Sequence, residues 1–508
     1  MNKVLKGLVA VAATAAMAVA GFAGASTAMA ENPATATTNP TITFPKGAQY
    51  QDHTYEVYQV FTGDLSDGVL SNVKYGKNST GTEGNEVPAS ELKKLTDVNV
   101  EGKTDQEKLT VIKTFADLTG TPVATLTKDN TSYTAVPGYY LIKDKDGSVS
   151  SETTDASTLY ITKVVGDVTI SPKSDVPSFE KKVKDTNDTT GDTSVWQDSA
   201  DYDVHDAVPF QLKATLPSNY ADYKTYYLAF HDVEEKGLSF NTDSVKVAVD
   251  GTQITSGYEV KTTGLTDNCT FEVVFTDLKT AVAAAKNGSV ITVDYTSTLT
   301  EQAVLGNQGN VNKAKLQFSN NPNSEQGGES TPTGETPWDS VIVFTYKVVV
   351  NKVNENKKPL KGAAFKLEKK LNGGTTTSVK EFTAGEDTSF TFSGLDDGDY
   401  ILTETTTPAG YNTIKPITFT VTAEHNIEWT TGKRTDVLTR LNGTAASGEI
   451  TFTADTTVGS LTADVVNVKG SNLPSTGGMG TVILYVAGIA VFVLAGATLV
   501  MALRRRNA

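Results

Sequence analysis

The sequence of 508 residues contains one cysteine, Cys269. A single cysteine cannot form an intramolecular disulfide, so a disulfide-stabilised framework is excluded. We expect Cys269 to be a small buried hydrophobic residue, with a reactive thiol as the alternative. If the chain is exported, its stability must come from something other than disulfides.

Histidine is also scarce. The four histidines, His53, His205, His231 and His425, lie in unrelated segments without the spacing typical of metal ligands. No nucleophile-elbow motif is present. The sequence therefore predicts no metal, no other cofactor and no enzymatic activity, although a catalytic triad assembled from distant segments cannot be read from sequence.

Basic residues and long helical patterns are few as well. The chain has 44 Lys and Arg against 59 Asp and Glu, a net charge of -15. This balance argues against nucleic acid or an anionic membrane surface as the main partner. Threonine, valine, glycine and aspartate are abundant, which favours short strands joined by turns. The length predicts two to four domains.

The first thirty residues have the pattern of a secretory signal peptide. Lys3 and Lys6 precede an uncharged, alanine-rich stretch at residues 7–30, which closes with the small residues Ala28 and Ala30 around Met29. This order of charge, apolar stretch and small residues is typical of a cleaved signal. A first transmembrane helix is the weaker alternative. We therefore predict residues 1–30 to be a signal peptide.

The other end combines three parts. Residues 481–503 are uncharged and long enough to span a bilayer, and residues 504–506 are arginines, which favour the cytoplasmic side. A short motif precedes them, consisting of Leu473, Pro474, Ser475, Thr476 and Gly477. Together the parts resemble the cell-wall sorting signal of sortase substrates. The resemblance implies cleavage between Thr476 and Gly477, a thioester on Thr476 and attack by a waiting amine. A permanent single-pass anchor is the alternative.

Between the two ends we expect three domains. Residues 31–173 combine strand patterns at 54–61 and 139–142 with helical stretches at 91–95 and 106–118. Residues 174–333 form a second domain with a polar linker around 324–337. Residues 334–470 open with the apolar run 341–350 and carry several turn signals, and residues 471–508 are the sorting signal. The predicted fold class is mainly β: tandem immunoglobulin-like sandwiches, some helix in the first domain and a C-terminal transmembrane helix.

Three residues of the third domain lie at apolar strand positions. Lys352 shares a strand face with Val348 and Val350, Glu404 follows Tyr400 and Leu402 in alternation, and Asn467 lies two residues after Val465. These segments resemble collagen-adhesin B-type domains. The resemblance implies a spontaneous amide bond between Lys352 and Asn467, with Glu404 as its catalyst.

Burial explains the need for these three residue types. Burial favours a neutral lysine and a protonated carboxyl group. The neutral amine can attack the asparagine side-chain carbonyl while the acid moves protons and ammonia leaves. The alternative is a buried Lys–Glu ion pair beside a hydrogen-bonded asparagine.

The second domain carries a similar pattern. Lys181 lies between Phe179 and Val183, Asp232 follows Leu228 and Phe230, and Asn320 ends a run with Ala314, Leu316 and Phe318. These segments resemble the isopeptide-forming middle domain of Gram-positive backbone pilins. The resemblance implies a cross-link between Lys181 and Asn320 with Asp232 as catalyst. Lys182 and Asn321 remain alternatives, because a slip of one residue reverses the face.

The last candidate is Lys173, which follows Pro172 between the first two domains. Backbone pilins carry a motif here whose lysine attacks the sortase thioester. Ser171 departs from it, since tyrosine is usual at that position. Over nearly the full chain the resemblance implies a secreted, wall-anchored pilus subunit joined from Thr476 to Lys173 of the next identical subunit. Implied partners are a pilus-specific and a housekeeping sortase, peptidoglycan, a minor or tip pilin, and host glycans or matrix. A monomeric wall-anchored adhesin is the alternative.

Overall fold

We analysed the chain in a computed structural model that describes residues 39–46, 50–66, 69–98, 105–149, 156–170, 172, 176–324, 326–446 and 448–470. The predicted signal peptide, Lys173 and the sorting signal with its transmembrane helix all lie outside these residues. The chain divides into two compact units. Unit 1 comprises residues up to Thr186, Thr193–Thr345 and His425–Leu438, and unit 2 comprises Asn187–Asp192, Tyr346–Glu424 and the residues from Thr439 onward.

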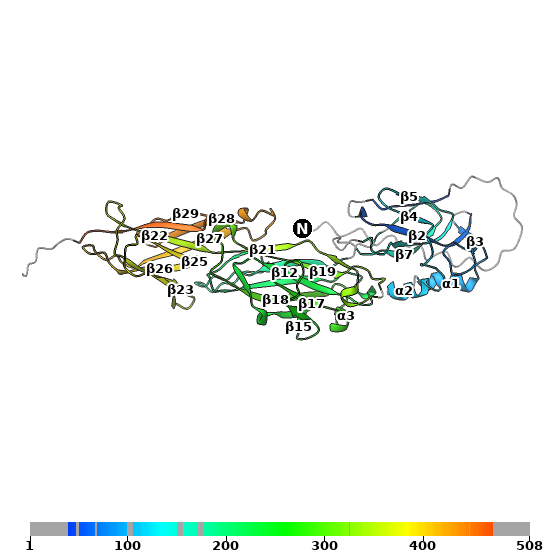
Figure 1. Ribbon diagram of the computed structural model, residues 1–508, viewed down its shortest axis with the longest axis horizontal. Coiled ribbons are helices and arrows are strands. Elements are labelled where there is room, and N and C mark those ends of the chain that lie inside the picture. The colour runs from blue at the N-terminus through cyan, green and yellow to red at the C-terminus, as the bar shows by residue number, and fades with distance from the viewer. Residues whose placement is uncertain are drawn as a thin grey trace, which may run out of the picture. The chain divides into compact units, whose positions relative to one another are not determined.

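The first part of unit 1 combines two sheets with two helices (Figure 1). One sheet has the order β5-β1-β8, and the other has the order β3-β2-β6-β7 with β4 paired to β2. The elements are β1 (Thr41–Thr43), β2 (Tyr55–Ser66), β3 (Val69–Tyr75), α1 (Ala89–Val98), α2 (Asp105–Ile112), β4 (Ala124–Leu126), β5 (Ser132–Thr134), β6 (Gly138–Asp144), β7 (Leu159–Val164) and β8 (Val168–Thr169).

Strand β2 is hydrophobic on both sides because it contributes to two cores. Val57 packs in the cluster shared with the β1 sheet, and Val60 packs in the cluster that includes Leu95 of α1 and Ile112 of α2. This confirms the expectation of a mixed first domain. The second helix ends at Ile112, whereas the sequence predicted helix as far as residue 118.

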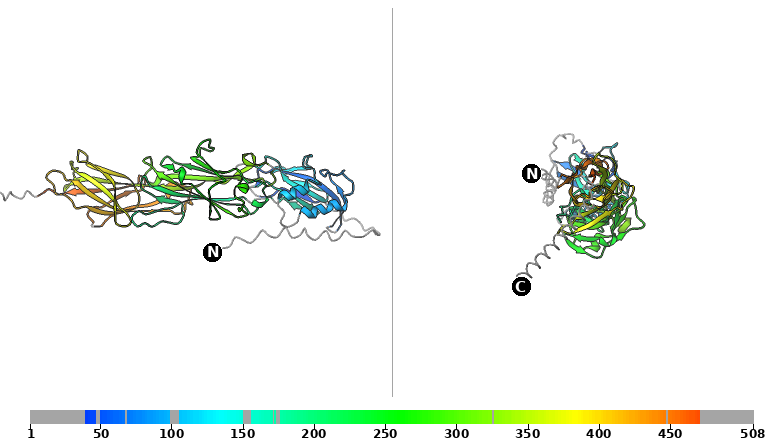
Figure 2. Two further views of the ribbon diagram at one scale, coloured as in Figure 1. Left: turned by 90° about the horizontal axis from the view of Figure 1, so that it is seen from below. Right: turned by 90° about the vertical axis from the view of Figure 1, so that its left-hand side faces the viewer.

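Two further sheets of unit 1 form the middle part of the chain (Figure 2). The first has the order β10-β21-β19-β12-β17-β16, with β20 paired to β19. The second has the order β15-β14-β18-β11-β9, with β13 paired to β18. Their elements are β9 (Ser178–Val183), β10 (Ser199–Asp201), β11 (Ala207–Thr215), β12 (Leu228–Glu234), β13 (Leu238–Phe240), β14 (Lys246–Val249), β15 (Thr252–Ile254), β16 (Glu259–Lys261), β17 (Phe271–Phe275), α3 (Leu278–Ala281), β18 (Val290–Leu299), β19 (Asn310–Ser319), β20 (Thr333–Glu335) and β21 (Asp339–Phe344).

These two sheets enclose one large hydrophobic core. Strand β18 alternates buried and partly exposed residues, so that Ile291, Val293 and Tyr295 point inward, as period-two alternation requires. Phe230 of β12 and Leu316 of β19 face the same core from the other sheet. The middle part is therefore a two-layer β structure, in which the inward positions of β9, β12, β18 and β19 define an interior site.

Unit 2 is built on two sheets. One has the order β25-β22-β30-β29, and the other has the order β24-β23-β26-β27-β28. In the first sheet β22 and β30 run parallel, with Lys352 opposite Val465. The elements are β22 (Tyr346–Asn354), β23 (Ala364–Lys370), β24 (Thr376–Glu381), β25 (Ser389–Leu395), β26 (Gly398–Thr406), β27 (Ile417–His425), β28 (Leu438–Ala445), β29 (Thr453–Asp455) and β30 (Ser460–Asn467).

The structure differs from the sequence prediction at the boundary between the second and third domains. The third domain was expected to open with the apolar run 341–350, but this run is divided at Thr345. Its first half is β21, which pairs with β19 and β10, and its second half is β22 of unit 2. The expected linker also contains β20, which pairs with β19. An apolar run buried on both faces does not reveal which sheet receives each half.

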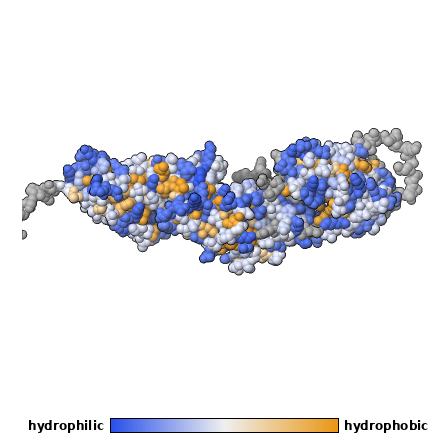
Figure 3. Space-filling view, in the orientation of Figure 1, coloured by the Kyte–Doolittle hydropathy of each residue, from blue (hydrophilic) through white to orange (hydrophobic). Residues whose placement is uncertain are grey.

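The surface is mixed in hydropathy, and the described helices are short. On the face shown in Figure 3, hydrophobic residues are scattered among hydrophilic ones over both units. Within the part of the chain that the structure describes, no helix has the length and hydropathy needed to cross a membrane. Short 3₁₀ turns complete the described elements: η2 (Tyr220–Asp222), η3 (Thr242–Ser244), η4 (Gly306–Gln308), η5 (Gly328–Ser330) and η6 (Arg434–Asp436).

Candidate functional site

The structure brings Lys352, Glu404 and Asn467 together in the interior of unit 2. They come from β22, β26 and β30, and the side chains of Lys352 and Glu404 are completely inaccessible to solvent, as is Asn467. Alternation places each of them on the buried face of its strand, as the sequence predicted. Strands β22 and β30 of one sheet and β26 of the other thus meet at one buried polar site.

The hydrogen bonds of this site orient the asparagine amide. Lys352 Nζ donates to Asn467 Oδ1 at 2.5 Å and to the Val465 carbonyl at 2.9 Å. Asn467 Nδ2 donates to Glu404 Oε1 at 3.0 Å and Oε2 at 3.1 Å. Glu404 Oε1 lies 3.7 Å from Lys352 Nζ. The amine therefore lies beside the amide carbonyl, and the carboxyl group lies beside the amide nitrogen rather than the carbonyl.

Burial also changes the protonation of the lysine. Loss of hydration lowers the pKa of Lys352 to about 8, against the opposing effect of the Glu404 charge. A substantial fraction of the amine is then neutral near pH 8, and only a neutral amine is a nucleophile. The site combines a nucleophile, an electrophilic amide and an acid within hydrogen-bonding distance.

A second buried site lies in the middle part of unit 1. Lys181 Nζ donates to Asp232 Oδ2 at 2.6 Å and to the Tyr295 hydroxyl at 2.7 Å, and Lys181 and Asp232 are both completely buried. Tyr295 also donates to Asp232 Oδ2 at 2.8 Å. Burial lowers the pKa of Lys181 and raises the pKa of Asp232. The predicted lysine and acid are therefore brought together in β9 and β12.

The asparagine of this second site is not the one that the sequence predicted. Asn312 of β19 donates to the Tyr295 hydroxyl at 2.9 Å and is completely buried. Asp232 pairs across the ladder with Ala314, two residues from Asn312 on the same face. Asn320 lies six residues beyond Ala314, which separates it from Asp232 by about 20 Å along the strand. The structure therefore does not bring Asn320 to Lys181.

The sequence pattern could not distinguish Asn312 from Asn320. Asn312 and Asn320 have the same parity in the strand pattern, so alternation cannot choose between them. The antiparallel register of β12 and β19 makes the choice, and that register is a property of the sheet. The alternatives are also placed elsewhere: Lys182 pairs with Asp198 at 2.6 Å, and the Asn321 side chain accepts from the backbone of Asn323.

Two groups of the second site were missed in the sequence. Tyr295 connects lysine, acid and asparagine, and Glu234 accepts from Asn312 Nδ2 at 3.3 Å. Burial, reinforced by the charge of Asp232, raises the pKa of Glu234 to about 8. Glu234 continues the alternation of Leu228, Phe230 and Asp232, and that pattern was the available signal.

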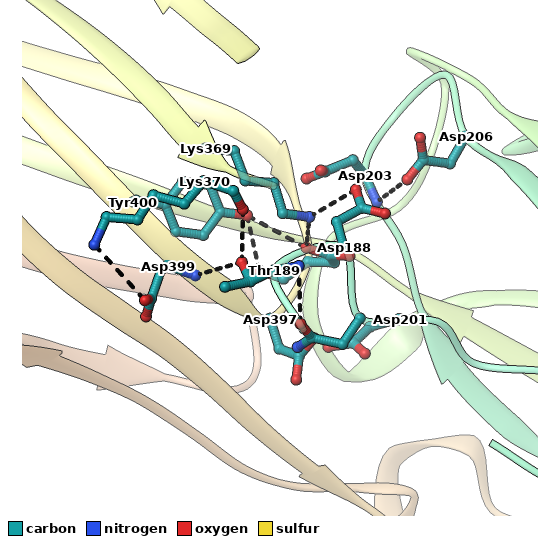
Figure 4. A network of polar contacts seen from close by, with 12 residues as sticks. Asp188, Thr189, Asp201, Asp203, Asp206, Lys369, Lys370, Asp397, Asp399 and Tyr400 are labelled. Carbon is teal, nitrogen blue, oxygen red and sulfur yellow. Dashed lines mark hydrogen bonds and ion pairs between the residues drawn. The ribbon is translucent and has the colours of Figure 1, made fainter. Parts of the chain in front are cut away.

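A further buried lysine, Lys369 of β23, has carboxylate partners (Figure 4). Its Nζ lies 3.1 Å from Asp188 Oδ2 and also contacts the carboxylate of the fully buried Asp396. Thr189 donates to the Lys370 carbonyl at 2.8 Å and accepts from the Asp399 amide at 3.0 Å. These contacts hold residues 187–192 within unit 2 as an ion-pair network, without the lysine–amide geometry of the two sites above.

The single thiol is buried. Cys269 is 8% exposed, and burial raises the pKa of its thiol to about 12. The thiol is therefore protonated at neutral pH, as expected for a buried cysteine that is not reactive by itself.

Comparison with known proteins gives a family match for part of unit 2 and one curated relative of the chain. Residues 346–435 match the family model described as the SpaA prealbumin-like fold domain. The chain is 26% identical over 430 residues to the trypsin-resistant surface T6 protein of Streptococcus pyogenes serotype M6, across 72% of this chain and 74% of that protein.

Two solved structures are similar to this chain. The T6 backbone pilin of serotype M6 S. pyogenes, described as a modular three-domain structure, superposes with a TM-score of 0.50 and 18% identity, covering 86% of this chain and all of that one. The full-length major pilin SpaD of Corynebacterium diphtheriae has a TM-score of 0.47 at 18% identity, covering 87% of this chain and 99% of that one. At 18% identity, the likeness to the T6 backbone pilin concerns the fold alone.

Proposed function

Starting from this relationship to the major backbone pilins of Gram-positive bacteria, we propose that the chain is the repeating subunit of a covalently polymerised surface pilus. Its domains are immunoglobulin-like sandwiches of the collagen-adhesin type, each of the last two closed by a Lys–Asn amide bond. The observation that carries the proposal is the geometry of Lys352, Glu404 and Asn467, because its three groups fit a cross-linking reaction between the first and last strands of a domain.

The cross-linking step follows from the contacts. Neutral Lys352 Nζ attacks Cγ of Asn467, and a proton passes from Nζ to the Glu404 carboxylate 3.7 Å away. Glu404, which accepts from Asn467 Nδ2, returns a proton to that nitrogen as the C–N bond breaks. One amide forms, and one ammonia leaves.

We propose the same reaction for the middle part of the chain, between Lys181 and Asn312. Asp232 is the proton carrier nearest the amine, and Tyr295 holds amine and amide on one hydroxyl. Asp232 Oδ1 and Asn312 Oδ1 have no hydrogen-bond partner among the described residues, which suits a protonated acid that donates to the carbonyl during the reaction.

Polymerisation rests on residues outside the described part of the chain. We propose that a pilus-specific sortase cleaves between Thr476 and Gly477 and joins Thr476 to Lys173 of the next subunit. A housekeeping sortase then links the base of the polymer to peptidoglycan. Partner pilins and host glycans or matrix belong to the same proposal. In the competing role, a monomeric wall-anchored adhesin, only the sorting signal is used.

A boiled denaturing gel of wall extracts separates these roles. Cells that carry the wild-type chain are expected to give a ladder of high-mass species, and Lys173→Ala is expected to reduce the ladder to monomer. Lys128→Ala, which removes an exposed lysine of the first domain, is the matched control and should keep the ladder. A monomer in the wild type would establish the adhesin instead, and a ladder that survives Lys173→Ala would assign polymerisation to another lysine.

A further inference from the structure

The outer face of the β12–β17 sheet carries a cluster of metal-ligand types that the proposed cross-link does not use. His231 lies directly opposite Glu272 in the ladder, on the face of β12 that is turned away from Asp232. The loop before β17 brings Cys269 and Asp267 against the same histidine. His231, Cys269 and Glu272 are 2%, 8% and 5% exposed, so the cluster is built into the sheet rather than scattered on its surface.

The distances from the histidine to the other groups are those of neighbouring ligands on one metal ion. His231 Nδ1 lies 3.7 Å from Cys269 Sγ, 3.5 Å from Glu272 Oε1 and 3.6 Å from Asp267 Oδ2. Ligand atoms bound at about 2.0–2.3 Å to a tetrahedral zinc ion are about 3.3–3.8 Å from one another. The three separations from His231 Nδ1 fall in this range, and the ligand atoms of His231, Cys269 and Glu272 all lie within 4.8 Å of one another.

Neighbouring groups orient the ligands. Glu272 Oε1 accepts from the Thr266 amide at 2.8 Å and from its hydroxyl at 2.9 Å, which fixes the carboxylate beside His231 Nδ1. The Cys269 amide donates to the Thr266 carbonyl at 2.9 Å and holds the thiol in place. Supporting hydrogen bonds of this kind are typical of metal ligands.

From this geometry we propose that His231, Cys269 and Glu272 form a binding site for a zinc-class divalent cation, with Asp267 at its edge. Sulfur, imidazole and carboxylate ligands together suit zinc and cobalt better than calcium or magnesium. Binding replaces the thiol proton: Cys–SH and M²⁺ give the metal thiolate and one H⁺. The sequence predicted no metal because these ligands come from two strands and a loop, without a short spacing motif.

Charged groups of both signs lie beside the proposed cation site. Lys315, opposite His231 in the ladder, lies 2.8 Å from Asp267 Oδ2 and disfavours a nearby cation. Glu335 lies 2.5 Å from the same ammonium and neutralises it. Asp267 is 39% exposed at its side chain and leaves an entry path for the ion.

Cobalt alone is a suitable probe, because a thiolate ligand produces a charge-transfer absorption that carboxylates do not. The purified mature chain is expected to bind one equivalent of Co²⁺ with this absorption, and Zn²⁺ is expected to displace it. Cys269→Ser should abolish the thiolate absorption, and His231→Ala should weaken binding more than tenfold. His205→Ala, at an exposed histidine beside Glu301, is the control and should bind as the wild type does.

Thermal melting of each variant without metal separates loss of ligands from loss of folding. Cys269→Ser is nearly isosteric and should melt close to the wild type. Absence of the thiolate absorption in the folded wild type overturns the proposal. Equal cobalt binding by wild type and Cys269→Ser overturns it as well, because the metal is then held by surface carboxylates only.

Discussion

At the scale of residues, the two buried sites show how the same chemistry is prepared by different neighbours. Lys352 has its asparagine and its acid in direct contact. Lys181 contacts its acid directly and shares the Tyr295 hydroxyl with its asparagine. In both sites the cost of burying an ammonium ion lowers the pKa of the lysine, and this makes the amine reactive.

Intact mass spectrometry counts the cross-links. The mature wild-type chain should be lighter than its sequence by two ammonia molecules, since each bond releases one. Lys352→Ala, Glu404→Ala and Asn312→Ala should each be lighter than their own sequences by one ammonia only. Asn320→Ala is the matched control and should still lose two. If Asn320→Ala loses one and Asn312→Ala loses two, the cross-link uses Asn320 and the register argument fails.

The lowered pKa of Lys352 also predicts a pH dependence in a chain that cannot form this bond. Lys352 has a pKa of about 8 in the folded chain against an ordinary value of 10.5, and Asn467→Ala leaves this amine free to titrate. Between these values the unfolded state holds more protons, so unit 2 should become more stable as the pH rises from 8 to 10.

Urea unfolding of Asn467→Ala across this pH range measures the effect. The double variant Lys352→Met, Asn467→Ala has no amine to titrate and should lack the rise. An equal rise in both variants would assign the effect to other groups.

At the scale of elements, the proposed cross-link in unit 2 would tie two neighbouring parallel strands. Lys352 and Asn467 are 115 residues apart, and β22 and β30 pair along their full common length. In the chain-entropy model, closing a loop of this size stabilises the folded state by about 4–5 kcal/mol. The proposed bond would therefore stabilise unit 2 as a disulfide does in chains that have two cysteines.

Single-molecule stretching tests this tie. With the bond present, residues 353–466 should add no length when the wild-type chain is extended. In Glu404→Ala the same segment should unfold and add about 400 Å for 115 extended residues. Thr403→Ala, next to Glu404 on the opposite strand face, is the control and should behave as the wild type. The proposed bond is refuted if the wild type releases the full length.

At the scale of the whole molecule, the proposed bonds define one path for tension along a pilus. The path enters at Lys173, crosses from Lys181 to Asn312, continues to Lys352, crosses to Asn467 and leaves at Thr476. Residues 182–311 and 353–466 are bypassed, so their sheets carry no load. Residues before Lys173 lie outside the path altogether.

This path predicts that the attachment point decides whether the first part of the chain unfolds. Stretching between residue 173 and residue 470 should show no unfolding of residues 41–170. Stretching between residue 39 and residue 470 should add those unfolding steps, because the first cores then lie in series with the load. Identical traces from both attachments would contradict the path.

The sequence by itself predicted that the fold is mainly β. It also predicted the burial of Lys352, Glu404 and Asn467 in unit 2 and the contact between Lys181 and Asp232. Alternation assigns a residue to a face, and burial of a lysine or glutamate among apolar neighbours is informative because it is costly. Local pattern gave the strand faces, and the resemblance to isopeptide-forming domains gave the selection of these residues. The two end signals are likewise local patterns, and they remain predictions.

Only the tertiary structure placed Asn312, rather than Asn320, beside Tyr295, divided the run 341–350 between two sheets, and assembled His231 with Cys269 and Glu272. Each of these outcomes depends on register or on strand partners, which pair residues far apart in the chain. A period of two says which face a side chain occupies, but two positions with the same parity are equivalent until a neighbouring strand is aligned with them.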